Sequence, residues 1–215
     1  MKKLIIFLIV IAVLVLGVAY AGFVPVVSPL LGTNKPRDLG VKYTKADYES
    51  IIQQAKFKLD NSAGFGPDTR ITYSPNKITV EGKFTQEQVS ALINFDHADG
   101  YPVSNTQIKI HADGTLEGAA QVGVNNYKGY SFHNAVYVKG KIDVTSAKSL
   151  KLNPEKLEVG RLPVPINEKA KNIVETAVNE KLNSIPGLAI ESVSFEEGKV
   201  NFKGTIPESA KRIKR

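Results

Sequence analysis

The chain has 215 residues, no cysteine, and a formal net charge of +7 from 28 basic and 21 acidic residues. The lack of cysteine excludes disulfides, thiol catalysis, cysteine metal ligands and lipoprotein acylation, so a hydrophobic core must hold the fold. Six of the basic residues lie at the two ends of the chain: Lys2, Lys3, Lys211, Arg212, Lys214 and Arg215. Removing these six from the 28 leaves 22 basic residues against 21 acidic ones. A domain so nearly neutral is not expected to bind nucleic acid.

Residues 4–24 form an apolar segment without Asp, Glu, Lys, Arg or His, and the next such residue is Lys35. As a helix rising ~1.5 Å per residue it would be about 31 Å long, which matches the hydrocarbon core of a bilayer. Lys2 and Lys3 favour a cytoplasmic N-terminus, so the rest of the chain is expected outside the cytoplasm. A small-x-small triplet at 19–21 leaves a cleaved signal peptide open. The apolar run continues past this triplet, and we therefore favour a retained anchor at 1–24.

The sequence after the anchor divides into a linker at 25–43, a single domain at 44–207 and a basic tail at 208–215. Prolines and glycines recur along the linker and predict an extended spacer. These residues are Pro25, Pro29, Gly32, Pro36 and Gly40. The domain is long enough to bury a sizeable core and too short for two domains of ordinary size.

The domain sequence predicts repeated units, each a helix followed by a β-hairpin. The first unit begins with a capping box at 44–47, and its hairpin is expected at 71–84 around a turn at 74–77. Two or three further strands are expected at 135–145 and 149–164, between the second and third units.

The second and third units repeat this order. Thr85 and Gln88 form a capping box that begins the second helix, and a hairpin follows at 108–116. The third helix spans 167–185, where an apolar stripe at helical spacing ends before a Pro-Gly pair. Its hairpin is expected at 193–206.

Four strands share a glycine on the apolar face with a charged neighbour on the polar face: Gly82, Gly118, Gly140 and Gly204. Such glycines mark bulges, bends or close packing against the backbone. We therefore predict an α+β fold in which a strongly curved antiparallel sheet wraps around long helices. A ligand groove is predicted between these glycines and the stripe of the third helix. That stripe includes Ile173, Val174, Ala177, Val178 and Leu182.

Three segments carry a resemblance to known proteins: TQEQVSALIN at 85–94, NTQIKIHADGTLEG at 105–118, and LNSIPGLAIESVSFEEGKVNFKGTIP at 182–207. They resemble small membrane-anchored extracytoplasmic proteins of the YpmS and LmeA kinds, which are similar in architecture to tubular lipid-binding proteins. The resemblance covers 78–206 and follows the helix-then-hairpin pattern. It implies a curved sheet around a long helix, an apolar groove, and a role at the envelope in lipid handling or partner contacts. It transfers no catalytic or binding residue.

Candidates for chemistry are few. The sequence His-Ala-Asp-Gly occurs at 97–100 and at 111–114, and the two copies together would offer imidazoles and carboxylates to a metal. The spacing lacks the alternating oxygen ligands of a calcium loop, and Asp-Gly favours tight turns, so turns are predicted and no metal. His133 is expected to be structural. Because no catalytic motif is present, we predict a protein that is not an enzyme and needs no cofactor.

Two surface features could contact a partner. Tyr127, Tyr130 and Phe132 form either an aromatic loop tip at a membrane or the ordinary packing of a strand. The tail residues Lys211, Arg212, Lys214 and Arg215, with Lys2 and Lys3, are candidates for contact with anionic lipid head groups, although a frayed tail is equally expected.

Two functions follow from this pattern. The first is a membrane-anchored, extracytoplasmic module that binds a lipid or another apolar ligand. The second is a structural or protein-interaction module of the envelope whose core is filled by its own helix. A connected apolar cavity of a few hundred Å³ would favour the first, and close packing would favour the second.

Overall fold

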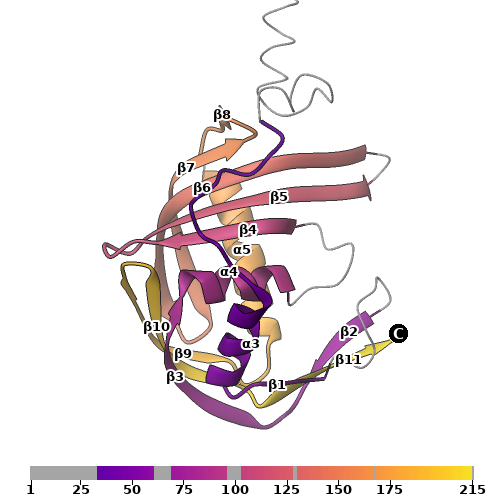
Figure 1. Cartoon of the computed structure of the whole chain (residues 1–215), viewed down its shortest axis with the longest axis vertical. Coiled ribbons are helices and arrows are strands. Elements are labelled where there is room, and N and C mark those ends of the chain that lie inside the picture. The colour runs from indigo at the N-terminus through magenta and orange to yellow at the C-terminus, as the bar shows by residue number, and fades with distance from the viewer. Residues whose placement is uncertain (1–32, 61–68, 96–102, 128–129, 167, 215) are drawn as a thin grey trace, which may run out of the picture.

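The computed structural model describes residues 33–60, 69–95, 103–127, 130–166 and 168–214. In these ranges the protein is an α+β fold of mostly antiparallel strands and a few helices (Figure 1). Within the same ranges, no helix has the length and apolar character needed to cross a bilayer. The predicted anchor at 4–24 lies outside the described residues.

The helices in the described ranges begin where the sequence predicts. They are α3 (Lys45–Gln54), α4 (Gln86–Phe95) and α5 (Glu168–Ser184). Thr44 and Asp47 form a reciprocal capping box at the start of α3. At the start of α4, Gln88 N donates to Thr85 Oγ1 over 3.2 Å, and Thr85 N donates to Gln88 Oε1 over 2.8 Å. After α5 the chain turns at Gly187, whose φ of +72° favours glycine.

The described strands form three sheets rather than the single sheet predicted. The small sheet has the order β1 (Lys58–Asp60), β11 (Ser209–Lys214), β2 (Thr69–Tyr73). The middle sheet has the order β3 (Lys77–Thr85), β10 (Lys199–Pro207), β9 (Ala189–Glu196). The large sheet runs in chain order through β4 (Val103–Ile110), β5 (Thr115–Tyr127), β6 (Tyr130–Ser146), β7 (Ser149–Val159) and β8 (Leu162–Pro163). Only β1 and β11 pair in parallel among the described strands.

Two of the three predicted hairpins are confirmed, and the first is wrong. The pairs β4–β5 and β9–β10 are antiparallel neighbours joined by tight turns. In contrast, β2 pairs with β11 and β3 pairs with β10, so 74–77 is no hairpin turn. Backbone bonds from Ser74 N to Ser209 O and from Glu208 N to Asn76 O join the two ladders. The segments β2–β3 and β10–β11 therefore run side by side as one bent ribbon, interrupted near Pro75, which has no N–H to donate (Figure 1).

The described hydrophobic core lies between the middle sheet and the helices α3 and α4. Its buried centre is Ile51 of α3 with Val80 and Phe84 of β3. Partly buried side chains from α3, α4, β3 and β10 pack around it: Ile52, Ala55, Ile78, Val89, Leu92, Val200, Phe202 and Ile206.

The helix α5, whose apolar stripe was predicted to face the curved sheet across a groove, packs against β7 of the large sheet. Val178 and Leu182 are half-buried. The side chains of Ile173, Val174 and Ala177 lie outside what the structure describes, so the burial of the full stripe stays a prediction.

The inner-face glycines divide into two kinds. Gly140 and Gly204 lie at register shifts of β6 and β10, where a Cβ would meet backbone: at Gly140 it would lie 2.5 Å from Asn153 O. The predicted bulge or close backbone approach is confirmed for these two. At Gly82 and Gly118 a Cβ would instead meet a side chain, at 3.1 Å from Phe84 and 3.2 Å from Val138.

The predictions of a linker at 25–43 and a tail at 208–215 both need correction, because their described parts, 33–43 and 208–214, belong to the folded body. From Thr33, which is fully buried, the chain crosses the large sheet in an extended conformation. Arg37 binds Glu158 of β7 through two hydrogen bonds of 2.9 Å, and Val41 is buried. At the other end, 209–214 forms β11 in the middle of the small sheet. The side chain of Arg212 is 3 % exposed and therefore faces away from solvent.

Candidate functional site

An apolar groove of about 670 Å³ lies where the middle and large sheets meet. Its walls come from β4, β5, β6 and β7 on one side and from β9 and β10 on the other, with Val89 of α4. The apolar lining includes Ile110, Leu116, Val144, Val193, Phe195 and Phe202. A volume of this size lies within the range of small-molecule sites in proteins.

Strand alternation explains why one face of the large sheet is apolar. Ile108 and Ile110 line the groove, whereas Lys109 between them lines a polar pocket on the opposite face. The same holds on β5, where Leu116 lines the groove and Glu117 faces the polar pocket. The groove and the polar face are thus two sides of one sheet.

Backbone bonds join the two sheets at both ends of the groove. At one end Gly198 N, in the β9–β10 turn, donates to Ile110 O over 2.9 Å. At the other end Ile190 N donates to Ala147 O, in the β6–β7 turn, over 2.7 Å. The two sheets are therefore joined through their backbones on both sides of the groove.

The rim of the groove is charged. Lys141 lies 3.4 Å from Asp113, and Asp143 accepts a hydrogen bond of 2.6 Å from Asn153 Nδ2. Hydrogen bonds from the Thr115 backbone and hydroxyl lower the pKa of Asp113 to about 2. With Glu191, the described rim has three carboxylates against one ammonium group. This excess suits a ligand whose polar end is neutral or positively charged.

Helix side chains complete the edge of the large sheet at β4. Ile110 N donates to Gln86 Oε1, Ile108 N to Ser90 Oγ and Thr106 N to Asn94 Oδ1. The three α4 residues are four apart, a spacing of about 6 Å along a helix, and their strand partners are two apart, about 6.6 Å along a strand. The three side chains of α4 therefore accept hydrogen bonds from the edge of β4 as the backbone of a neighbouring strand would.

A similar arrangement occurs at β7. Asn179 of α5 accepts from Leu150 N over 2.8 Å and donates to Leu150 O over 3.0 Å. Glu175, one turn earlier, accepts from Leu152 N over 3.0 Å. Our sequence reasoning missed both edges, although polar residues repeating every fourth position on a helix were a readable signal.

The opposite face of the large sheet carries a chain of polar contacts. His111 Nε2 lies 2.7 Å from Glu117 Oε1, and the Tyr137 hydroxyl donates to Glu117 Oε2 over 2.7 Å. The Arg37 guanidinium stacks on the Tyr137 ring at 4.7 Å and pairs with Glu158. Burial and the hydrogen bond to Glu117 raise the pKa of Tyr137 to about 12. Burial opposes ionisation of Glu117, but the bonds from Tyr137 and His111 outweigh it and lower its pKa.

The predicted turn at 111–114 is confirmed, with Gly114 N donating to His111 O over 3.1 Å and Gly114 at φ +80°. The second copy, at 97–100, lies outside the described residues. In the part of the chain that is described, no cluster of three or more His, Asp and Glu side chains could hold a metal. The side chains of Tyr127, Tyr130, Phe132 and His133 are likewise outside the description.

Among the predicted groove residues whose side chains are described, none lines the groove. The glycines Gly82, Gly118, Gly140 and Gly204 shape their strands but do not line it. Of the stripe on α5, neither of the described side chains, Val178 and Leu182, contributes to the lining.

The structure bears differently on the individual residues predicted to contact the membrane. The buried side chain of Arg212 cannot contact a membrane surface, which corrects that prediction. Lys211 is exposed and lies 3.3 Å from Asp60, so its charge is partly balanced. The side chains of Lys2, Lys3, Lys214 and Arg215 lie outside the described part of the chain.

Comparison with known proteins gives no match: no family, no curated protein and no solved structure matches this chain significantly. The resemblance to the YpmS and LmeA kinds of protein therefore stays a prediction.

Proposed function

We propose that this protein is a membrane-anchored, extracytoplasmic module, not an enzyme, that binds the apolar part of a lipid in the groove between its middle and large sheets. The groove is the observation that supports this most directly, since it combines a volume of about 670 Å³ with a largely apolar lining. In this proposal the two sheets act together as one curved layer around the ligand.

The construction of the groove also supports binding. Apolar surface in a packed core is covered by neighbouring side chains at close to crystal density. Here the bonds from Gly198 to Ile110 and from Ile190 to Ala147 fix the two sheets at their ends. An apolar chain entering the space would cover these side chains without moving the backbone, and burial would contribute about 25 cal/mol for each Å² removed from water.

The anchor adds a source of ligand. Residues 4–24 are expected to span a bilayer, and the described structure begins only nine residues later, at Thr33. A lipid-binding domain tethered this closely would meet its ligand at high effective concentration. The alternative, a scaffold whose core is filled by its own helix, predicts instead that no lipid enters.

Photocrosslinking tests the proposal on the full-length chain. Membranes containing the protein are loaded with a phospholipid that carries a diazirine on its acyl chain, irradiated, and the crosslinked peptides are identified by mass spectrometry. We expect crosslinks at Leu116, Val144 or Val193, in addition to any within 4–24. Crosslinks confined to 4–24 would favour the alternative function, a scaffold whose core is filled by its own helix.

A matched pair of variants makes the result specific. Val193→Trp places a bulky side chain in the groove and should abolish crosslinks to β5 and β6. Ile71→Trp makes a comparable change on β2 of the small sheet, where Ile71 is 40 % exposed and does not line the groove, and it should leave them unchanged.

A further inference from the structure

A second pocket, of about 430 Å³, lies on the polar face of the large sheet, on the side opposite the apolar groove. It is lined by Arg37, Asp38, Leu39, Lys109, Glu117 and Arg161. Four elements therefore converge on it: the extended segment after Thr33, the strands β4 and β5, and the turn between β7 and β8. Three of its six residues carry a positive charge.

The two carboxylates in this pocket are already engaged. Glu117 receives the Tyr137 hydroxyl on one oxygen and faces His111 Nε2 with the other, both at 2.7 Å. Asp38 Oδ1 accepts a hydrogen bond of 2.8 Å from Gly40 N. Neither carboxylate forms an ion pair with a pocket cation among the described contacts.

The three cations of the pocket differ in how far neighbouring carboxylates neutralise their charge. Arg37 shares Glu158 with Lys156, so that one carboxylate serves two cations. Within the described ranges, Lys109 and Arg161 form no ion pair with any carboxylate, and both are half-buried. Half-buried cations without a counter-ion are the groups that an incoming anion would stabilise.

We propose that Arg37, Lys109 and Arg161 bind the phosphate of an anionic lipid head group. Guanidinium and ammonium groups are the usual protein ligands of phosphate, and an arginine offers it paired donors. The pocket is polar and lies on the face away from the groove, so its ligand differs in chemistry from an acyl chain held between the sheets.

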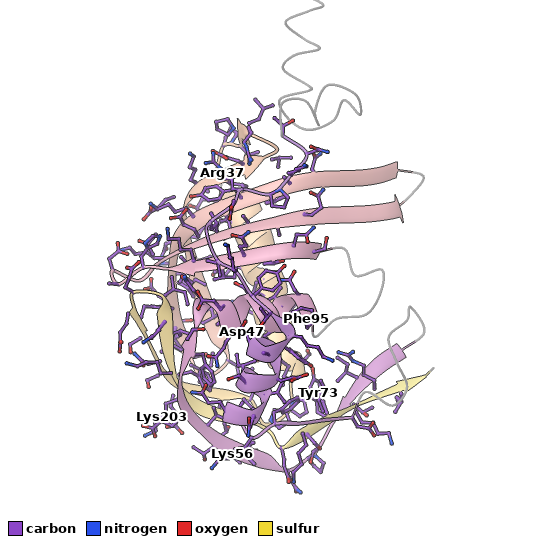
Figure 2. All side chains as sticks on the ribbon, in the orientation of Figure 1. Arg37, Asp47, Lys56, Tyr73, Phe95 and Lys203 are labelled. Carbon is purple, nitrogen blue, oxygen red and sulfur yellow. The ribbon has the colours of Figure 1, made fainter. Side chains whose placement is uncertain are left out.

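The position of the pocket residues in the chain favours a lipid over a free anion as the ligand. This step rests on the membrane anchor of the proposed function. Only residues 25–32 separate the expected span from Thr33, which limits the distance between them to about 30 Å. Arg37 is four residues further on and lies at the end of the molecule opposite Lys56 and Lys203 (Figure 2). The anchor would hold the pocket end of the domain near the head groups of its own membrane.

The test uses the full-length chain in nanodiscs of equal amounts of phosphatidylglycerol and phosphatidylcholine, with retained lipids identified by native mass spectrometry. We expect the wild-type protein to retain phosphatidylglycerol in excess. Lys109→Gln with Arg161→Gln should lower that excess by roughly tenfold or more, the effect of two cations near an anionic surface. The charge-retaining pair Lys109→Arg and Arg161→Lys should preserve it, with an unchanged melting temperature as the check on folding.

A control pair keeps the result specific to the pocket. Lys77→Gln with Lys199→Gln removes the same charge from exposed positions on the middle sheet. An equal loss in both pairs, or retention at the bulk ratio in the wild-type protein, would overturn the proposal. Stabilisation of the wild-type protein by inorganic phosphate without retention of phosphatidylglycerol would assign the site to a free anion and also overturn it. Acyl-chain crosslinking in the groove is a separate readout, so either proposal can fail without the other.

Discussion

Asn94 and Thr106 pair as two strand residues would, although one of them lies on a helix. Asn94 Nδ2 donates to Thr106 O over 2.7 Å, and Thr106 N donates to Asn94 Oδ1 over 2.9 Å. The side-chain amide reproduces the donor and acceptor of a peptide group, so the edge of β4 is closed to further pairing. This contact ties α4 to the large sheet and leaves the apolar face of that sheet to the groove.

Replacing Asn94 by Leu should therefore destabilise the fold. The change leaves the N–H and C=O of Thr106, whose side chain is 5 % exposed, without their partners, and it should cost about 1 to 3 kcal/mol of unfolding free energy. Asn172→Leu is the control, since Asn172 is exposed on α5. Urea unfolding of the full-length chain in mild detergent, followed by circular dichroism, measures both. Equal effects would show that the pairing with Thr106 contributes nothing.

A glycine pair tests the bulge in β6. Gly140→Ala places a Cβ 2.5 Å from Asn153 O and 2.7 Å from Pro154 Cα, and backbone on the partner strand cannot move aside cheaply. We expect a loss of about 1 to 3 kcal/mol. Gly118→Ala meets side chains only: Val138, which is 41 % exposed, at 3.2 Å, and Ile108 at 3.5 Å. This second change should be nearly neutral, and a loss as large as that of Gly140→Ala would contradict the distinction.

Local features of the fold were predictable, and pairings between distant segments were not. The capping boxes of Thr44 with Asp47 and of Thr85 with Gln88 span three residues, so their sequence alone places the helix starts. In contrast, Arg37 and Glu158 are 121 residues apart, and nothing local to Arg37 indicates that a Pro- and Gly-rich segment packs on the sheet.

The same limit explains the first hairpin and the groove. The pattern at 71–84 is that of two strands with a turn, and it is equally that of one bent strand pairing with β10 and β11. Hydrophobic alternation shows that Ile108, Ile110 and Leu116 share a face, yet it does not say which element covers them. We predicted that α5 covers them; in the described lining of the groove, β9 and β10 lie opposite these residues, and most of the α5 stripe lies outside the description.

Low pH should reduce the stability of the fold, because Glu158 becomes protonated. Burial alone would raise the pKa of this carboxyl, but hydrogen bonds from Lys156 and Arg37 outweigh it and lower the pKa. A carboxyl with a lowered folded pKa stabilises the fold above its unfolded pKa of ~4.3 and loses that contribution as pH falls through the folded value. We therefore expect stability to decline below about pH 4.

Arg37→Gln isolates this effect. It should cost about 1.5 to 3 kcal/mol at pH 7, the range for hydrogen bonds to a charged group, and it should reduce the decline below pH 4. Lys45→Gln is the control: its pair with Glu49 is exposed at both ends and 3.7 Å long, so its loss should cost at most about 0.5 kcal/mol. Urea unfolding between pH 3 and pH 7 measures both variants. An unchanged pH dependence in Arg37→Gln would remove Glu158 as the cause.

Enlarging one valine in the groove and one in the core shows whether the groove is open in solution. Val193→Phe extends into the space between the sheets, so it should change the unfolding free energy by less than about 1 kcal/mol. Val80→Phe adds the same atoms where the side chain is 5 % exposed and packed among Ile51 and Phe84. Overpacking there should cost about 1 to 3 kcal/mol or more, because a dense core cannot take the added volume without strain. If Val193→Phe proved as costly as Val80→Phe, the groove would be filled by the protein itself, and the scaffold function would replace lipid binding.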